Sequence, residues 1–160
     1  MYKVIATFKR NPQLTAEECD NYYRSFHTTL GRRLCESIPG FRKYVQNRVI
    51  STIVTDFNNA DQAHPGEGDF DWAIEFHFDR AEDLAKAFAS PEMKACFADH
   101  INFMDINIPG NIKTYEVQEF MALERDPYTG QLCYPATLAD ESPYKERIQR
   151  ALAETKAGKP

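Results

Sequence analysis

The chain has 160 residues and a mass of 18.4 kDa, a size that suits one domain with a short appendage. Apolar residues make up 42% and aromatic residues 12% of it, so a sizeable core can form and wholesale disorder is excluded. Its 19 basic and 24 acidic side chains give a net charge of −5, and no basic run offers a track for phosphates, which argues against nucleic-acid binding. No apolar stretch is long enough to span a membrane and the N-terminus lacks the apolar segment of a signal peptide, so we expect a cytoplasmic protein.

The four cysteines, Cys19, Cys35, Cys96 and Cys133, are scattered along the chain. They form no Cys-x-x-Cys pair, so the sequence predicts neither a zinc site nor a thioredoxin-like motif. Walker, Gly-x-Gly-x-x-Gly, His-Glu-x-x-His and Gly-x-Ser-x-Gly motifs are also absent from the sequence. We therefore expect no cofactor and no metal.

The first strand and the first helix are predicted within the first 35 residues. Residues 2–10 are rich in β-branched and aromatic side chains, which predicts a strand. Thr15 followed by Glu18 has the pattern of a capping box, and we expect a helix from there to about Cys35. The apolar residues of this helix recur in steps of three and four: Cys19, Tyr22, Tyr23, Phe26, Leu30 and Leu34.

Two further strands are predicted on either side of a polar stretch. After a break at Pro39-Gly40, residues 41–51 form the second strand, and residues 56–69 are predicted as a polar loop that is long enough to be functional or mobile. The third strand, over residues 69–79, alternates strictly between two faces. One face carries Phe70, Trp72, Ile74, Phe76 and Phe78, and the other carries Asp71, Ala73, Glu75, His77 and Asp79.

Two helices and a fourth strand complete the pattern. Ser90-Pro91 separates a helix over residues 80–90 from one over residues 91–104, because serine caps a helix and proline suits its first position. The second helix is expected to bury Met93, Phe97, Ile101 and Met104. A turn over residues 107–111 leads to a strand over residues 112–124. The order β-α-β-β-α-β predicts a ferredoxin-like α+β fold, with a four-stranded antiparallel sheet and helices on one face.

The chain is expected to divide at residue 124. Residues 1–124 form the domain, and residues 125–160 form a C-terminal extension with a polar helix, which we expect to wrap the domain or a partner subunit. Helices on one face leave the other sheet face, with Ala73, Glu75 and His77, uncovered. A twofold interface needs only one self-complementary patch, so we predict a homodimer through this face.

Several short motifs, taken in their order, resemble the EthD-like family of dimeric α+β barrel proteins. They are Pro12-x-Leu14 after a basic strand end, Tyr23 and His27 in Tyr-x-x-x-His, Pro39-Gly40 with Tyr44, the segment Phe88 to Glu92, and Phe103-x-Asp105. The likeness covers residues 1 to about 122. It implies sheet-to-sheet dimerisation into a barrel, but it implies function only loosely. Relatives include lactone isomerases, polyketide cyclases, dehydratases, decarboxylases and cofactor-free monooxygenases.

Three residues are candidates for catalysis. His27 lies along the apolar stripe of its helix and could act as a general acid or base near neutral pH, unless it is a hydrogen-bonded core histidine. His100 lies on an apolar helix face, where it could also serve packing, and its neighbour Asp99 is expected to point elsewhere. Asp105 could orient a histidine or hold a substrate hydroxyl, or it could simply cap a turn.

Five further residues are weighed as binding or interface groups. Tyr23, Tyr44 and Trp72 could line a substrate pocket, with the tyrosine hydroxyls binding a carbonyl or phenol oxygen, or they could be plain core aromatics. His77 shares a strand face with Glu75, either in a barrel-lining site or in an interface salt bridge. Tyr22 is weighed in the same way as the other tyrosines, and His64 is expected to be exposed unless its loop is a lid.

The sequence favours a small enzyme for a hydrophobic cyclic, aromatic or polyketide-like metabolite, working by proton transfer without a cofactor. This would make it a lyase or isomerase of secondary metabolism or aromatic degradation, catalysing isomerisation, dehydration, cyclisation or decarboxylation. Two alternatives stay open: a cofactor-free monooxygenase of phenolic substrates, and a non-catalytic accessory or ligand-binding subunit of a degradation or biosynthesis pathway.

Overall fold

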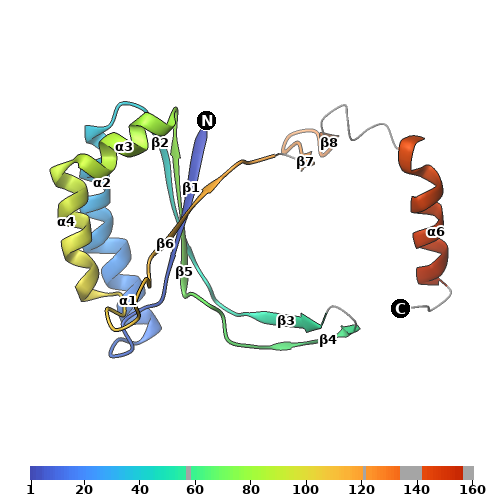
Figure 1. Ribbon diagram of the computed structural model, residues 1–160, viewed down its shortest axis with the longest axis horizontal. Coiled ribbons are helices and arrows are strands. Elements are labelled where there is room, and N and C mark those ends of the chain that lie inside the picture. Colours follow the sequence, from blue (N-terminus) through green and yellow to red (C-terminus); the bar gives the residue numbers. More distant parts are fainter. Residues whose placement is uncertain (57–58, 121, 134–141, 157–160) are drawn as a thin grey trace. The chain divides into compact units, whose positions relative to one another are not determined.

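The computed structural model of the chain describes residues 1–56, 59–120, 122–133 and 142–156. Its internal contacts define two units (Figure 1). The first unit consists of Met1–Ile53 and Pro65–Gln118, and the second of Val54–His64 and Glu119–Pro160. Each is described in turn below.

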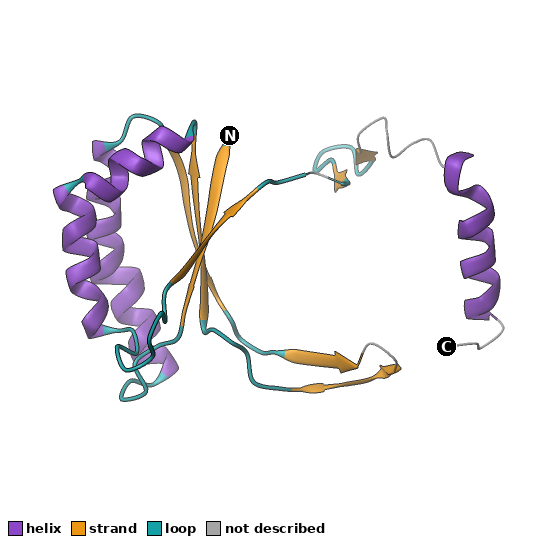
Figure 2. Ribbon diagram, viewed as in Figure 1, coloured by secondary structure: helices purple, strands orange, loops and turns teal. Residues whose placement is uncertain are grey.

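The first unit contains a four-stranded sheet in the order β2-β5-β1-β6, with every neighbouring pair antiparallel. Its helices lie on one face of this sheet (Figure 2). The predicted ferredoxin-like α+β fold is therefore confirmed. The four strands are β1 (Tyr2–Phe8), β2 (Phe41–Arg48), β5 (Trp72–Phe78) and β6 (Lys113–Val117).

The helix predicted from Thr15 contains an unexpected π-helical turn. The capping box is confirmed, since the Thr15 side chain accepts from the backbone N–H of Glu18 and the Glu18 carboxylate accepts from the N–H of Thr15. The chain then runs through α1 (Ala16–Tyr22), a π-helical turn (Tyr23–His27) and α2 (Thr28–Ser37).

The π-helical turn keeps one side of this helix buried. Four buried residues follow each other at intervals of four: Cys19, Tyr23, His27 and Gly31. An α-helix turns by about 100° per residue, so each such step overshoots a full turn by about 40°. The wider π turn takes up this overshoot. Phe26, which was expected in the buried stripe, is instead 54% exposed.

Ser90 separates the next two helices, α3 (Ala81–Ala89) and α4 (Pro91–Asp99), as predicted. The Ser90 hydroxyl accepts from the N–H of Met93, and a 3₁₀ turn (His100–Asn102) follows α4. The predicted buried stripe of α4 is wrong in part. Ile101 is 56% exposed, whereas Cys96 and Asp99 are buried.

Aromatic rings fill the core between the helices and the sheet. Phe8 stacks on Trp72 with ring centroids 5.5 Å apart, and it meets Tyr23 and Phe103 edge-on at 5.4 Å. The face of β5 with Trp72, Ile74 and Phe78 is thus the buried one, as its alternation predicts.

The predicted loop over residues 56–69 is wrong in its first half. The second unit contains β3 (Ile53–Asp56) paired with β4 (Asn59–Pro65), and next to them the N–H of Gly66 donates to the carbonyl of Thr52 over 3.0 Å. The sequence NADQAHP has few good strand formers, so pairing of the backbone overrides its weak propensity here.

The predicted fourth strand, over residues 112–124, is longer than the observed one. β6 ends at Val117, which faces Lys3 near the start of β1. A strand loses its backbone partners where its neighbour ends, which explains why the ladder stops here.

The rest of the second unit contains a small hairpin and a helix. β7 (Glu124–Arg125) pairs with β8 (Leu132–Cys133), and a 3₁₀ turn (Ser142–Tyr144) precedes α6 (Lys145–Lys156). The predicted C-terminal helix is confirmed as far as Lys156, and residues 157–158 lie outside the described residues. The expected wrapping role of this extension stays a prediction. Within the described ranges, no helix has both the length and the apolar character needed to cross a membrane.

Candidate active site

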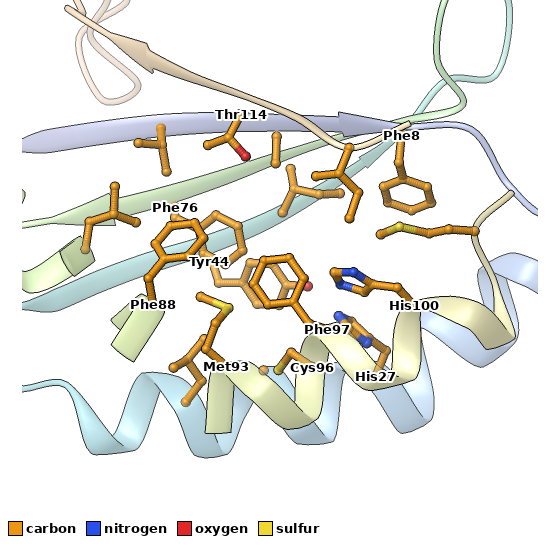
Figure 3. Close-up of a pocket in the computed structure, with 18 of the residues that line it drawn as sticks. Phe8, His27, Tyr44, Phe76, Phe88, Met93, Cys96, Phe97, His100 and Thr114 are labelled. Atoms are coloured by element: carbon orange, nitrogen blue, oxygen red, sulfur yellow. The ribbon is translucent and has the colours of Figure 1, made fainter. Parts of the chain in front are cut away.

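An apolar cavity of about 80 Å³ lies between the sheet and the helices of the first unit (Figure 3). Phe76 and Tyr44 from the sheet and Met93 from α4 contribute to its wall. Phe88 of α3 and Phe97 of α4 are 44% and 45% exposed, and their ring centroids lie 6.0 Å apart. These two rings therefore lie where the cavity meets the surface. His27 and His100 lie side by side at one end (Figure 3).

His27 is held by a carboxylate from α4. Its Nδ1 atom lies 2.9 Å from Oδ2 of Asp99, and each residue is only 6% exposed. The other oxygen of Asp99 accepts from the Tyr22 hydroxyl at 2.6 Å and from the Asn102 amide at 2.8 Å. The carboxylate thus has three partners, which fix its position against the imidazole ring.

The other ring nitrogen of His27, Nε2, faces accessible space. Among the described residues it has no hydrogen-bond partner, and no buried side-chain nitrogen or oxygen of theirs lacks one. Because His27 lines the cavity, the accessible space at Nε2 is the cavity itself. Asp99 accepts at Nδ1, so the proton of the neutral ring resides there and the lone pair is on Nε2.

Burial governs the protonation of this pair. It lowers the pKa of His27 below its ordinary value and outweighs the hydrogen bond and charge of Asp99, which raise it. For Asp99, burial alone would raise the pKa, but hydrogen bonds from Tyr22, Asn102 and His27 outweigh it and the pKa is lowered. At neutral pH the site therefore holds a neutral imidazole beside an ionised carboxylate.

His100 is a second neutral imidazole in the cavity. Its ring centroid lies 5.4 Å from that of His27 and 5.0 Å from that of Phe97. Burial first, and then the nearby charge of His27, lower its pKa to about 4. Two uncharged imidazoles can therefore face the same bound molecule at pH 7.

Two tyrosines supply the other polar atoms in the middle of the cavity. The hydroxyls of Tyr23 and Tyr44 lie 2.9 Å apart, and the Tyr44 ring stacks on Phe76 with centroids 4.9 Å apart. Burial raises the pKa of both, that of Tyr44 to about 12, so both phenols keep their protons at neutral pH. The π-helical turn also stacks the Tyr23 ring on His27, with centroids 5.1 Å apart.

The structure brings together four of the predicted site residues and separates three. His27, His100, Tyr23 and Tyr44 all line the cavity. Trp72 is 1% exposed and packs in the aromatic core instead. His77 lies on the opposite sheet face, with its Nε2 atom 3.2 Å from Oε2 of Glu75. Asp105 lies in the turn after α4.

The surroundings of two of these residues match the plainer interpretations of the sequence. The Asp105 carboxylate accepts from the backbone N–H of Asn107 at 2.9 Å, as a turn-capping aspartate does. His64 lies on β4 and is exposed. Neither residue lines the cavity that contains His27.

Sequence reasoning missed Asp99, Gln46 and Thr28. Asp99 was expected to point away because the buried face of α4 was placed about one residue out of register. Gln46 donates to the hydroxyls of Tyr44 and Thr28 at 2.9 Å each. Its position on β2 two residues after Tyr44 is the one signal that could have indicated this contact.

The comparisons with known proteins agree with this architecture. The family model of the EthD domain matches residues 11–107. An ethyl tert-butyl ether D (EthD) family protein from Bacillus halodurans is similar in structure, with 23% identity and a TM-score of 0.52, over 75% of this chain and 99% of that one. A dimeric ferredoxin-like protein of unknown function from Jannaschia sp. CCS1 is 9% identical with a TM-score of 0.51, over 74% and 98% of the two chains. Among curated proteins no match is found.

The chain therefore belongs to the EthD domain family, as its motifs indicate. The matched segment contains the whole His27–Asp99 pair and both tyrosines. The structural likenesses, at these levels of identity, establish the fold alone.

Proposed function

We propose that this protein is a proton-transfer enzyme for a hydrophobic cyclic molecule and that His27 is its general base. One observation carries this proposal: Nδ1 of His27 is bound to Asp99 at 2.9 Å, while Nε2 faces an apolar cavity. A neutral imidazole with a fixed tautomer is ready to take a proton from a bound molecule. Asp99 then stabilises the imidazolium that forms, as the carboxylate of an oriented histidine does.

The apolar wall suits this chemistry. Water is largely excluded from a cavity lined by Phe76, Phe97 and Met93, so the charges that develop during proton transfer interact strongly with nearby polar groups. His100, neutral and close to His27, is in a position to return a proton to the substrate. Isomerisation, dehydration, cyclisation and decarboxylation all share the first step, removal of a proton.

Exchange of carbon-bound protons tests the proposal without knowledge of the natural substrate. 2-Tetralone, an enolisable bicyclic ketone, is incubated with the protein in D₂O, and loss of its C1 proton signal is followed by NMR. We expect the wild-type protein to accelerate exchange and His27→Gln to return it to the buffer rate. Equal rates for both proteins would contradict the role of His27.

The same assay separates the two alternatives. Exchange that persists under argon supports proton transfer, whereas turnover that strictly requires oxygen, measured with a phenolic probe in an oxygen electrode, would favour the cofactor-free monooxygenase. A wild-type protein that binds 2-tetralone but never accelerates exchange would favour a ligand-binding or accessory role.

We also propose that the protein is a homodimer through the sheet face opposite the helices. On this face the charges pair among themselves: the Glu75 carboxylate lies 2.8 Å from Nζ of Lys3 and 3.2 Å from Nε2 of His77. Ile5 and Tyr115 face each other beside them in the β1–β6 ladder. A face of apolar residues and internally paired charges suits a self-complementary interface. The Jannaschia protein of the same fold is itself described as dimeric.

A further inference from the structure

The hydrogen atoms around Tyr44 can be assigned one by one. The Gln46 side-chain nitrogen donates its two hydrogens to the hydroxyl oxygens of Thr28 and Tyr44, at 2.9 Å each. The Thr28 hydroxyl donates to the carbonyl of Tyr23 at 2.8 Å. An amide nitrogen only donates and a carbonyl only accepts, so the direction of each of these bonds is fixed.

Two phenol hydrogens remain, and they share one contact. The hydroxyls of Tyr23 and Tyr44 lie 2.9 Å apart, and a single hydrogen bond between them uses only one of the two hydrogens. Among the described residues, the other phenol hydrogen has no acceptor. Tyr23 is 2% exposed, whereas Tyr44 is only partly buried. Because an unpaired donor is least costly where space is accessible, the hydrogen without an acceptor belongs to Tyr44.

This donor and the base lie on the same cavity. The Tyr23 ring joins them, since it stacks on His27 and its hydroxyl contacts that of Tyr44. Figure 3 shows the Tyr44 ring between Phe76 and the two histidines. Tyr44 accepts two hydrogen bonds, from Tyr23 and Gln46, and such acceptance strengthens its own donation. The cavity therefore offers a hydrogen-bond donor next to a proton acceptor, within apolar walls.

We propose that the Tyr44 hydroxyl binds a carbonyl oxygen of the substrate and that the substrates are cyclic ketones with a removable proton on the neighbouring carbon. This inference rests on the proposed function of His27. Nε2 of His27 takes the proton, the C–H electron pair forms the enolate double bond, and the negative charge moves to the oxygen held by Tyr44. The proton then returns to the same or another carbon, so no other reactant is needed. The high pKa of Tyr44 keeps it a donor throughout this step.

A pair of probes that differ in one oxygen tests this inference. Calorimetry compares the binding of 2-tetralone with that of its hydrocarbon counterpart, tetralin, to the wild type and to Tyr44→Phe. We expect the variant to bind 2-tetralone about tenfold more weakly, as for loss of one hydrogen bond, and tetralin within about twofold of the wild type. Equal effects on the two probes, or no effect on either, would overturn the inference.

Tyr23→Phe is the matched control. It removes the same kind of atom and breaks the same contact, but it leaves the Tyr44 hydrogen in place. We expect it to weaken 2-tetralone binding by about threefold or less. A larger effect at Tyr23 than at Tyr44 would assign the donor to the wrong residue.

A measurement on the wild type alone covers the case that a variant fails to fold. The carbonyl stretching frequency of bound 2-tetralone is expected to fall below its value in cyclohexane, because a hydrogen bond weakens the C=O bond. An unshifted frequency would overturn the inference.

The two proposals fail in different ways. If His27→Gln keeps the wild-type exchange rate while Tyr44→Phe discriminates between the probes, the role of His27 is wrong and a binding site for ring ketones remains. If His27→Gln loses exchange while Tyr44→Phe affects both probes alike, the base stands and the carbonyl donor is wrong. A wild type that binds neither probe contradicts both.

Discussion

The imidazole of His27 and the carboxylate of Asp99 form a buried pair across 72 positions of sequence, with Nδ1 and Oδ2 2.9 Å apart. His27 ends the π-helical turn before α2, and Asp99 ends α4. The packing of these helices therefore determines which tautomer His27 adopts. A carboxylate at this position places the lone pair on the nitrogen that faces the cavity.

Asp99→Asn is expected to slow the proton exchange of 2-tetralone by about 100-fold, with little change in the affinity for the ketone. The variant keeps the size of the side chain but removes the charge that stabilises the imidazolium. It also allows an amide hydrogen to point at Nδ1, which selects the wrong tautomer. Asp105→Asn is the control and should keep the wild-type rate, because Asp105 does not line the cavity. Similar losses in the two variants would point to a general effect of charge.

The exchange rate is expected to fall only on the acid side of the ordinary histidine pKa. Burial lowers the pKa of His27, so the ring stays neutral and basic until the pH drops below the usual histidine range. Asp99→Asn removes a negative neighbour that raises this pKa, so its acid limb should move to still lower pH. Rate profiles recorded from about pH 4 to about pH 9 on both proteins test this. An acid limb above the ordinary histidine pKa would contradict it.

Folding stability is expected to decrease as the pH falls, partly because of His100. In the unfolded chain His100 has its ordinary pKa near 6.5, and in the folded protein its pKa is about 4. Between these values the unfolded state binds more protons, so the free energy of unfolding falls as the pH falls through this window. Urea unfolding at about pH 7 and about pH 5 measures the slope. His100→Phe should reduce the difference between the two conditions, and an unchanged difference would assign the acid sensitivity to other groups.

Gly40→Ala is expected to destabilise the protein by about 2 kcal/mol. A Cβ atom at position 40 would lie 2.0 Å from Oδ2 of Asp83, a buried side chain at the start of α3. Urea unfolding of this variant, of Asp83→Ala and of the double variant forms a cycle. The glycine substitution should cost much less where Asp83 is already absent. Full additivity would show that the clash is not the cause.

Tyr115→Arg is expected to shift the proposed homodimer towards monomer. Tyr115 is 49% exposed on the sheet face opposite the helices, and an arginine there would bring two like charges near each other across a twofold interface. Light scattering after size exclusion measures the mass of the variant and of the wild type. Gln13→Arg, at an exposed position outside the sheet, is the matched control. A monomeric wild type would contradict the homodimer.

The fold was predictable because its signals are local. The capping box at Thr15, the Ser90-Pro91 junction and the alternation around Trp72 each specify an element from a few residues, and the order of the elements then limits the topology. The β3–β4 hairpin was missed because polar residues with weak strand propensity form it. Its pairing depends on backbone contacts that no side-chain pattern indicates.

The site was predictable only in half. His27 and Tyr23 share a helix, so their spacing placed them together. Asp99 was missed because Phe97 and Ile101 suggested a buried face about 100° away from the real one. Phe97 lies instead at the mouth of the cavity, where a large apolar residue is exposed for reasons of binding. A functional cavity thus misleads hydrophobic periodicity at the positions where it matters most.

The π-helical turn also determines how this protein must be compared with its relatives. Deleting one residue between Tyr23 and His27 would restore a plain α-helix but rotate everything after it by about 100°, moving Leu34 off the core. A relative with a gap in this short segment would therefore hold a different set of side chains against the cavity, however similar its sheet. An uninterrupted alignment from Cys19 to Gly31 is a sharper sign of shared chemistry than overall identity.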